Sequence, residues 1–299
     1  MNVIETQNLT KSYGKDRGII DLNLEIESGE IFGFIGPNGA GKSTTIRTLL
    51  GLIFPTSGRG SIFGLDIVKK TKDIKKQIGY IPAEVNYYHK MDVRELLDYS
   101  ADFYDIDCRS RIEELAEIFA LDLDRKILDL SRGNQKKAAI LQSLIHQPKL
   151  LILDEPTTGL DPLMRAKFFD ILTEENSRGT TIFFSSHTLS EVQKLCRRVG
   201  IIKEGRIIAV EDIETLRKKQ LRIVQIEFPY PAKSDEIDCS GIINLSADLN
   251  SLSFMFSGNM DTLLKTLAEK EIQDLIIEEP TLEEIFMHYY EDKSEEERD

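Results

Sequence analysis

A glycine-rich segment near the start of the chain has the residue types and the spacing of a phosphate-binding loop. Residues 36–43 read Gly-Pro-Asn-Gly-Ala-Gly-Lys-Ser and fit the pattern G-x-x-x-x-G-K-[ST] at every fixed position. Glycines let backbone N–H groups converge on phosphate oxygens, the Lys42 ammonium can reach the β and γ phosphates, and the Ser43 hydroxyl can bind Mg²⁺. The sequence therefore predicts a nucleotide site built from Gly36, Asn38, Gly39, Ala40, Gly41, Lys42, Ser43 and Thr44.

Two adjacent carboxylates, Asp154 and Glu155, directly follow the apolar run Leu150–Leu153, and Pro156 then stops the strand. The carboxyl ends of strands in an open α/β sheet face the ligand crevice. Asp154 is placed to join Ser43 in binding magnesium. Glu155 is placed to orient or deprotonate a water that attacks the γ-phosphate. Because a P-loop precedes them, we interpret the two acids as catalytic residues and not as a surface turn.

The segments that must position these residues alternate between strand-like and helix-like patterns. Ile31–Ile35 reads as a strand before the P-loop, and Ile46, Leu49 and Leu50 mark a helix after it. Leu150–Leu153 and 180–184 are continuously apolar or β-branched, which is typical of parallel strands covered on both faces. The sequence thus predicts an α/β fold with the parallel-sheet core of a P-loop NTPase.

A helical insertion is expected within about residues 83–147. Asp92 can cap its first helix, and the second helix carries a similar apolar face. The apolar positions are Val93, Leu96, Leu97 and Phe103 on the first helix, then Ile112, Leu115, Ile118 and Phe119 on the second.

The basic stretch Arg217–Lys219 interrupts this pattern and predicts two domains, 1–218 and 219–299. The second reads as a small α+β accessory domain with an acidic tail at 291–299. Thr281 and Glu284 have the spacing of a capping box that opens a last helix. Between residue 219 and this helix, the sequence predicts strands, a helix and a further strand. The apolar positions are Leu221, Ile223, Ile226, Phe228, Leu252, Phe254 and Phe256 on the strands and Leu263, Leu264 and Leu267 on the helix, and the further strand spans 272–277.

Composition excludes several classes of protein. The 299 residues carry 38 Lys and Arg against 51 Asp and Glu, and a net charge of −13 disfavours a nucleic-acid partner. Apolar runs are strand-sized, too short to span a membrane, and the first residues lack the pattern of a secretory signal, so we expect a cytoplasmic location. Cys108, Cys196 and Cys239 are far apart and are expected to be reduced thiols.

Together these motifs resemble the nucleotide-binding subunit of ATP-binding-cassette (ABC) transporters over the first two thirds of the chain. The set is more specific than any one member. Beyond the P-loop it comprises Leu151–Pro156, Leu130–Asn134 at the family's Leu-Ser-Gly-Gly-Gln signature, Thr158–Asp161 at its D-loop, Ser186 and His187 at its switch histidine, and Tyr13 at its adenine-stacking aromatic.

The signature segment also has a physical meaning. Ser131 stands where a helix to about Pro148 is expected to begin, so its hydroxyl and the following N–H groups can meet an anion. The resemblance implies that this anion is the γ-phosphate of ATP on a second subunit, bound by Ser131 and Gly133 in a head-to-tail dimer with two Mg-ATP. It further implies that Tyr13 stacks on adenine and that His187 acts in catalysis with Glu155 and Lys42.

The resemblance extends to partners and location. Pro280–Phe286 resembles the closing helix of type-2 exporters, the group that exports drugs, antibiotic peptides and polysaccharides. It implies a hydrolytic ATPase bound to the inner face of the cell membrane through a separate permease. Peptides, antibiotics and lipids all stay open as cargo, and the second ATP-binding subunit is either the same chain or a related one.

One departure from the family falls next to the predicted site. The family's Q-loop glutamine should follow Gly79–Pro82, where this chain has Ala83 and then Glu84. A one-residue shift in an extended segment turns the side chain the opposite way, which favours a true loss over replacement by Glu84. Arg132 and Asn134 replace a glycine and the glutamine of the signature and leave Ser131 in place.

Two alternative functions, a soluble non-transport ABC ATPase and a P-loop kinase or GTPase, fit the sequence less well. A soluble ABC ATPase of DNA repair would carry a long coiled coil between Lys42 and Ser131, and a ribosomal one would carry two cassettes; this chain has neither. A P-loop kinase or GTPase would leave Ser131, Asp161 and His187 unexplained, and the Asn-Lys-x-Asp pattern of guanine recognition is missing.

Overall fold

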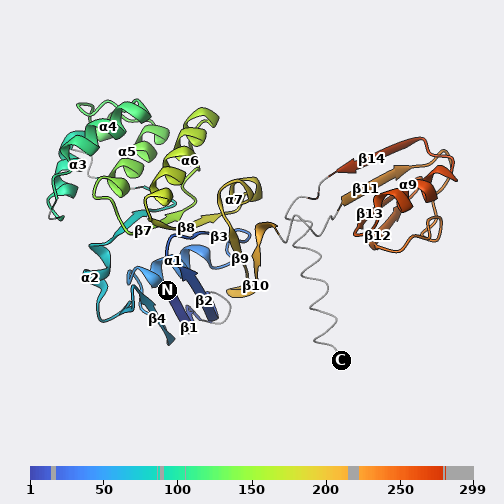
Figure 1. The fold of residues 1–299 in the computed structure, drawn as a ribbon, viewed down its shortest axis with the longest axis horizontal. Helices are drawn as coiled ribbons and strands as arrows, with labels where there is room; N and C mark the ends of the chain where they lie inside the picture. Colours follow the sequence, from blue (N-terminus) through green and yellow to red (C-terminus); the bar gives the residue numbers. More distant parts are fainter. Residues whose placement is uncertain are drawn as a thin grey trace. The chain divides into compact units, whose positions relative to one another are not determined.

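The computed structural model describes residues 1–14, 18–85, 87, 91–104, 106–214, 222–278 and 280. The chain forms two compact units, Met1–Asp212 and Ile213–Asp299, each with its own hydrophobic core (Figure 1). The domain boundary predicted at 218 lies in the segment 215–221, outside the described residues.

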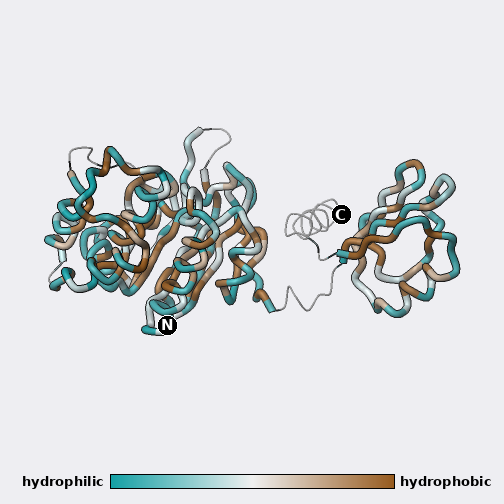
Figure 2. The backbone as a smooth tube through the Cα atoms, turned by 90° about the horizontal axis from the view of Figure 1, so that it is seen from above, coloured by the Kyte–Doolittle hydropathy of each residue, from teal (hydrophilic) through white to brown (hydrophobic). Residues whose placement is uncertain are grey.

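A six-stranded sheet forms the centre of the first unit. Its order is β10-β9-β3-β8-β7-β6, and all neighbours are parallel except the antiparallel pair β9 and β10. Every residue of β3, β7 and β8 is buried, which confirms the predicted central strands. Figure 2 shows hydrophobic segments running through the first unit. The strands are β3 (Ile31–Ile35), β6 (Ile78–Ile81), β7 (Leu150–Asp154), β8 (Thr181–Ser186), β9 (Arg198–Lys203) and β10 (Arg206–Asp212).

A second, antiparallel sheet of the first unit was not predicted. Its order is β2-β1-β4-β5. Leu22, Leu24 and Ile26 of β2 are buried and alternate with exposed residues, as expected for a strand with one face on the core. The strands are β1 (Asn2–Ser12), β2 (Gly18–Glu27), β4 (Ser57–Ile62) and β5 (Leu65–Asp66).

The predicted helical insertion is present as α3, η1, α4 and α5. Asp92 caps α3 as expected: its Oδ1 accepts the Glu95 N–H at 2.8 Å, and the Glu95 carboxylate accepts the Asp92 N–H at 3.1 Å. Phe103 was wrongly placed on α3; the helix ends at Ala101, and Phe103 is 62% exposed in the turn that follows.

The helices of the first unit are α1 (Lys42–Leu49), α2 (Thr71–Lys75), α3 (Val93–Ala101), α4 (Arg109–Phe119), η1 (Ile127–Asp129), α5 (Arg132–Leu144), α6 (Pro162–Ser177) and α7 (Leu189–Leu195). The helix that begins after Ser131 therefore ends before Pro148, to which it was expected to run.

The second unit is an antiparallel sheet in the order β12-β13-β11-β14 with helix α9. The predicted apolar face is correct on β13, but on β11 Val224 is buried and Ile223 is only half-buried. Leu263, Leu264 and Leu267 lie on helix α9 as predicted; Leu263 and Leu267 are buried, and Leu264 is 45% exposed. The elements are β11 (Arg222–Glu227), β12 (Ile242–Asp248), β13 (Ser251–Phe256), α9 (Met260–Ala268) and β14 (Asp274–Glu278).

The helix predicted to begin at Thr281 and the acidic tail at 291–299 lie outside the described residues. Cys108, Cys196 and Cys239 are free thiols, as predicted. Among the helices in the described ranges, none has the length and apolar character needed to span a membrane.

Candidate nucleotide-binding site

The P-loop joins the carboxyl end of β3 to the start of α1, as the motif requires. A side chain at Gly36 would place its Cβ 2.2 Å from the Ile202 carbonyl oxygen, so only glycine fits there. Gly41 is the N-cap of α1 with φ 112°, a left-handed backbone that favours glycine. The sequence thus bends the loop tightly enough to aim the N-terminus of α1 into it.

Lys42 is buried, and its ammonium lies inside the loop. Its Nζ donates to the carbonyls of Gly36 at 2.6 Å and Pro37 at 3.2 Å and lies 3.4 Å from Glu155 Oε1. Of the other predicted phosphate-binding residues, Asn38 and Gly39 are exposed, Ala40 is buried, and Ser43 and Thr44 are half-buried.

Asp154 ends β7 and is fully buried. Its Oδ1 accepts a hydrogen bond from Ser185 Oγ at 2.9 Å, whereas its Oδ2 has no hydrogen-bond partner among the described residues. Burial and the nearby Asp154 charge raise the pKa of Tyr80 to about 12. A buried carboxylate oxygen without a donor is a position that a cation would satisfy.

Glu155 connects the three residues predicted to act in catalysis. Its φ of 48° is left-handed, and its N–H donates to the Ser185 carbonyl at 3.2 Å. The carboxylate lies between the Lys42 ammonium at 3.4 Å and His187 Nδ1 at 2.5 Å. A non-glycine residue in this conformation is uncommon and concentrates at functional sites.

Tyr13 lies at the end of β1, next to the P-loop. Ser12 pairs with Gly18, and the Gly18 carbonyl would be 3.1 Å from a Cβ on Gly41. The Tyr13 ring is 56% exposed, and Lys11 Nζ lies 5.2 Å from its centroid. An exposed ring at this place is available to stack on a base.

Ser131 is the N-cap of α5, and its Oγ accepts the Asn134 N–H at 3.3 Å. A Cβ on Gly133 would lie 3.1 Å from the Gly159 carbonyl. The signature segment is therefore next to the segment 158–161. Within the described ranges, no hydrogen bond or ion pair joins Ser131 or Gly133 to residues 36–44 of the same chain.

The chain is similar to known proteins that bind ATP. The family model described as "ABC transporter" matches residues 19–158. The bacitracin transport ATP-binding protein BcrA of Bacillus licheniformis is 37% identical over 297 residues, which cover 92% of this chain and 96% of that protein. The chain belongs to the ABC transporter family. As a member, it is an ATP-binding subunit that hydrolyses ATP.

Further similarities agree with this assignment. The linearmycin resistance ATP-binding protein LnrL of Bacillus subtilis is 36% identical over 213 residues, 70% of this chain and 68% of that one. A solved structure of an ATP-binding subunit of an ABC transporter is 29% identical, with a TM-score of 0.69, and covers 73% of this chain and 92% of that one. These matches confirm the predicted α/β P-loop core.

Next to the predicted site of this ABC ATPase lies a buried carboxylate that the sequence did not single out, Glu191 of α7. Its Oε2 accepts hydrogen bonds from Thr157 Oγ1 and Ser186 Oγ, both at 2.9 Å, and its Oε1 lies 3.4 Å from Arg165. Ser186 immediately precedes His187, so this buried carboxylate fixes the backbone that carries the histidine. A glutamate on a short helix is ordinarily exposed, and only the fold shows that this one is not.

Replacing Glu191 with alanine should weaken hydrolysis without removing any group that contacts ATP. The change leaves the buried hydroxyls of Thr157 and Ser186 without their acceptor, which lowers the free energy of unfolding by about 2 kcal/mol. It also loosens the backbone that positions His187, so we expect kcat to fall about tenfold. Steady-state phosphate release and thermal unfolding measure the two effects. Ser190→Ala, an exposed change on the same helix, is the control; equal kcat in both variants would contradict the role of Glu191.

The structure describes the Q-loop position, where the sequence has Ala83 and Glu84. Ala83 is half-buried and Glu84 is exposed. The carbonyls of Pro82 and Ala83 accept hydrogen bonds from Lys136 of α5.

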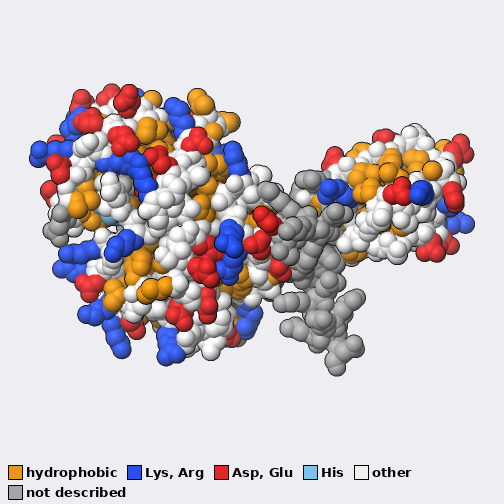
Figure 3. Space-filling view, viewed as in Figure 1, with side chains coloured by type: hydrophobic (Ala, Val, Ile, Leu, Met, Phe, Trp, Pro, Cys, Tyr) orange, Lys and Arg blue, Asp and Glu red, His pale blue; other side chains and the backbone are white. Residues whose placement is uncertain are grey.

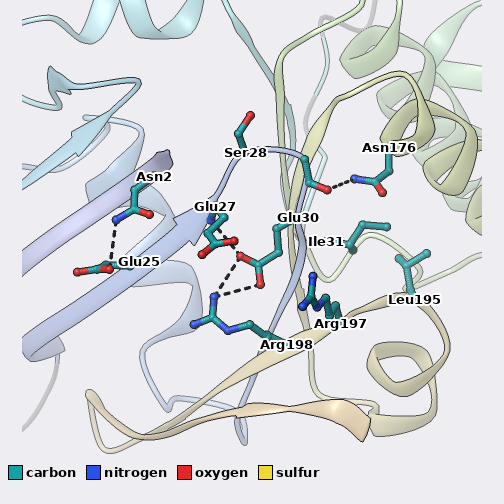
Figure 4. A pocket seen from close by; sticks show the side chains of 11 residues that line it. Asn2, Glu25, Glu27, Ser28, Glu30, Ile31, Asn176, Leu195, Arg197 and Arg198 are labelled. Carbon is teal, nitrogen blue, oxygen red and sulfur yellow. Dashed lines mark hydrogen bonds and ion pairs between the residues drawn. The ribbon is translucent and has the colours of Figure 1, made fainter.

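A cavity of about 410 Å³ lies at the opposite, amino end of β3 (Figure 4). There Glu30 accepts the Glu27 N–H at 3.0 Å and pairs with Arg198 at 3.2 Å, and Asn176 donates to the Gly29 carbonyl. None of the predicted site residues lines this cavity, so it is not the predicted ATP site.

Proposed function

We propose that this ABC ATPase powers an exporter, pairing with a second ATP-binding subunit around two Mg-ATP and moving an antibiotic or peptide-like cargo through a separate membrane permease. The observation that carries the proposal is Glu155, whose carboxylate lies between Lys42 and His187 at the end of β7. This arrangement supports a subunit that hydrolyses ATP over one that only binds it.

Each of these side chains has a distinct role in the proposed reaction. Lys42 binds the β and γ phosphates of ATP, and the N–H groups of 39–44 complete the cradle. Glu155 orients a water and accepts its proton as the water attacks the γ-phosphorus. His187 holds the Glu155 carboxylate and donates toward the γ-phosphate that accumulates charge. Tyr13 stacks on the adenine ring.

Asp154 and Ser43 fit the requirements of a magnesium ion. Asp154 offers the buried Oδ2 that lacks a partner, and Ser43 offers a hydroxyl on the first turn of α1. Mg²⁺ is ordinarily bound by one or two protein oxygens together with phosphates and water. No cluster of three or more His, Cys, Asp or Glu exists among the residues the structure describes, which agrees with a shared site of this kind. When bound, the ion neutralises charge that develops on the phosphates.

Pairing of two subunits is supported by the position of the signature segment. Ser131 is exposed and caps α5, a 13-residue helix, but it has no bond to the P-loop of its own chain. An exposed helix start is an anion site that a γ-phosphate on a second subunit can fill. The second subunit is either another copy or a related chain.

A permease is supported by an apolar groove on the first unit. The groove has a volume of about 420 Å³ and runs between the residues after β6 and helices α3 and α5. Hydrophobic side chains reach the surface near α3 and α2 in Figure 3. The large exposed hydrophobic residues in this part of the sequence are Leu52, Phe54, Val68, Tyr99, Phe103 and Ile106. We propose that a cytoplasmic segment of the permease packs here and holds the ATPase on the inner face of the membrane.

The cargo is proposed from the two relatives, whose names specify bacitracin transport and linearmycin resistance. Coexpression with the membrane protein that copurifies, followed by ATP-dependent uptake of labelled bacitracin into inverted vesicles, tests this proposal. Uptake that requires Glu155 supports it. An ATPase that copurifies with ribosomes or DNA and with no membrane protein would contradict it.

Deleting residues 219–299 should leave ATP affinity within about twofold, because every proposed nucleotide contact lies in the first compact unit, which has its own core. Titration with a fluorescent ATP analogue measures the affinity, and circular dichroism verifies that the truncated chain is folded. A folded truncation that binds no nucleotide would mean that the second unit contributes to the site.

A further inference from the structure

Lys136 is a buried lysine in the middle of α5. Its side chain is 3% exposed, and its Nζ donates to the carbonyl oxygens of Pro82 at 3.0 Å and Ala83 at 3.4 Å. The next residue, Lys137, is only half-buried. Lys136 therefore joins helix α5 to the segment that follows β6, across 53 residues of sequence.

Burial of this ammonium is costly in the absence of a direct counterion. Among the described residues, no carboxylate oxygen lies within ion-pair distance of its Nζ. Burial lowers the pKa of Lys136 to about 8, and the charges of Asp154 and Glu155 oppose that shift. The two carboxylates of the ATPase site thus act on Lys136 through space. Burying an ammonium without a contacting counterion is unfavourable, so the two backbone carbonyls are the partners that compensate Lys136 by contact.

The contacts of Lys136 connect the two ends of the catalytic machinery. On one side, α5 begins with Ser131 and Gly133, the residues proposed to meet ATP on a second subunit. On the other side, residues 82–83 continue from Ile81, which pairs with Leu153, the neighbour of Asp154. Lys136 thus links α5 to the end of β6, which lies beside the end of β7, where Asp154 and Glu155 stand.

We infer that Lys136 is a positioning residue of the ATPase site, which ties the backbone at Pro82–Ala83 to helix α5 where Ala83 offers no polar side chain. The inference rests on the ATPase activity and on the roles proposed for Asp154 and Glu155. The methyl side chain of Ala83 cannot form a hydrogen bond to helix α5. The backbone carbonyls of Pro82 and Ala83 accept the hydrogen bonds instead, and the Lys136 ammonium donates them.

Lys136→Met tests this role because methionine has nearly the length of lysine but has neither charge nor donors. We expect kcat for ATP to fall about tenfold, since the strand end loses its tie to α5, while KM changes by less than about threefold because the P-loop is untouched. Lys136→Arg keeps donors for the two carbonyls and should restore most of kcat.

Three controls make the result decisive. Lys137→Met removes the adjacent, less buried lysine and should behave as wild type. Hydrogen exchange of the backbone amides of Ile81, Ala83, Glu84 and Val85 should speed up in Lys136→Met and not in Lys137→Met, and this measurement does not depend on hydrolysis. Thermal unfolding identifies any variant that is globally damaged.

The inference is overturned if folded Lys136→Met hydrolyses ATP at the wild-type rate with unchanged exchange at 81–85. It is also overturned if the Met and Arg variants lose ATP binding and thermal stability together, which would make Lys136 a general structural residue. A wild-type chain that binds ATP without hydrolysing it would contradict the enzymatic function, and the exchange comparison would still decide the role of Lys136.

Discussion

Glu155→Gln is expected to slow ATP hydrolysis by about 10² to 10⁴-fold while ATP still binds, because the amide cannot accept the proton of the attacking water. The substitution keeps the shape of the side chain, and glutamine keeps a carbonyl oxygen that Lys42, 3.4 Å away, can still approach. Single-turnover hydrolysis and ATP titration separate the two effects. With ATP trapped, the variant should elute from a sizing column as a dimer.

Glu204→Gln is a matched control for this experiment, because Glu204 is exposed and also has a left-handed φ of 48°. It should hydrolyse ATP at the wild-type rate. A Glu155→Gln chain that stays monomeric with ATP bound at high protein concentration would contradict the proposed dimer of the isolated subunit. Hydrolysis at the wild-type rate would remove Glu155 from the reaction.

Lys42→Ala should act at the earlier step and weaken ATP binding itself. The ammonium makes charge-assisted bonds to phosphate oxygens, and losing about 1.5 to 3 kcal/mol raises Kd by about 10 to 100-fold. The carbonyls of Gly36 and Pro37 also lose their donor, so the loop loosens. Equilibrium titration with a fluorescent ATP analogue measures Kd. Lys69→Ala, an exposed change, is the control, and equal affinity in both variants would refute the P-loop role.

The sequence predicted the central sheet well because its signals are local. Strand β3 can be recognised because a P-loop follows its apolar run, and β7 because Asp154 and Glu155 stand at its end. Each signal lies within about ten residues of sequence. The antiparallel sheet went unpredicted because β1 is irregular: its register with β2 shifts at Asn2/Ile4, Thr6/Leu9 and Leu9/Lys11. Each shift moves apolar side chains to the other face and hides the alternation that identifies a strand.

The residues proposed to contact ATP could be predicted from the sequence, and the residues proposed to position them could not. Lys42, Asp154 and Glu155 follow from motif and strand end. Glu191 contacts Thr157, 34 residues away in sequence, as well as the nearby Ser186, and Lys136 contacts Ala83, 53 residues away. No local pattern distinguishes either residue from surface residues. The same limit explains Ile223, whose apolar character fits either face of β11 until β13 fixes which face is covered.

The left-handed backbone at Glu155 means that this subunit sacrifices some stability at its reactive centre. A glycine there would relax the backbone by about 1 kcal/mol, yet it would lack the carboxylate. Selection for a more stable chain would therefore favour loss of function at this one position. If Glu155 has the proposed role, the β7 terminus is a poor place to engineer thermal stability, because the stabilising change would remove the carboxylate.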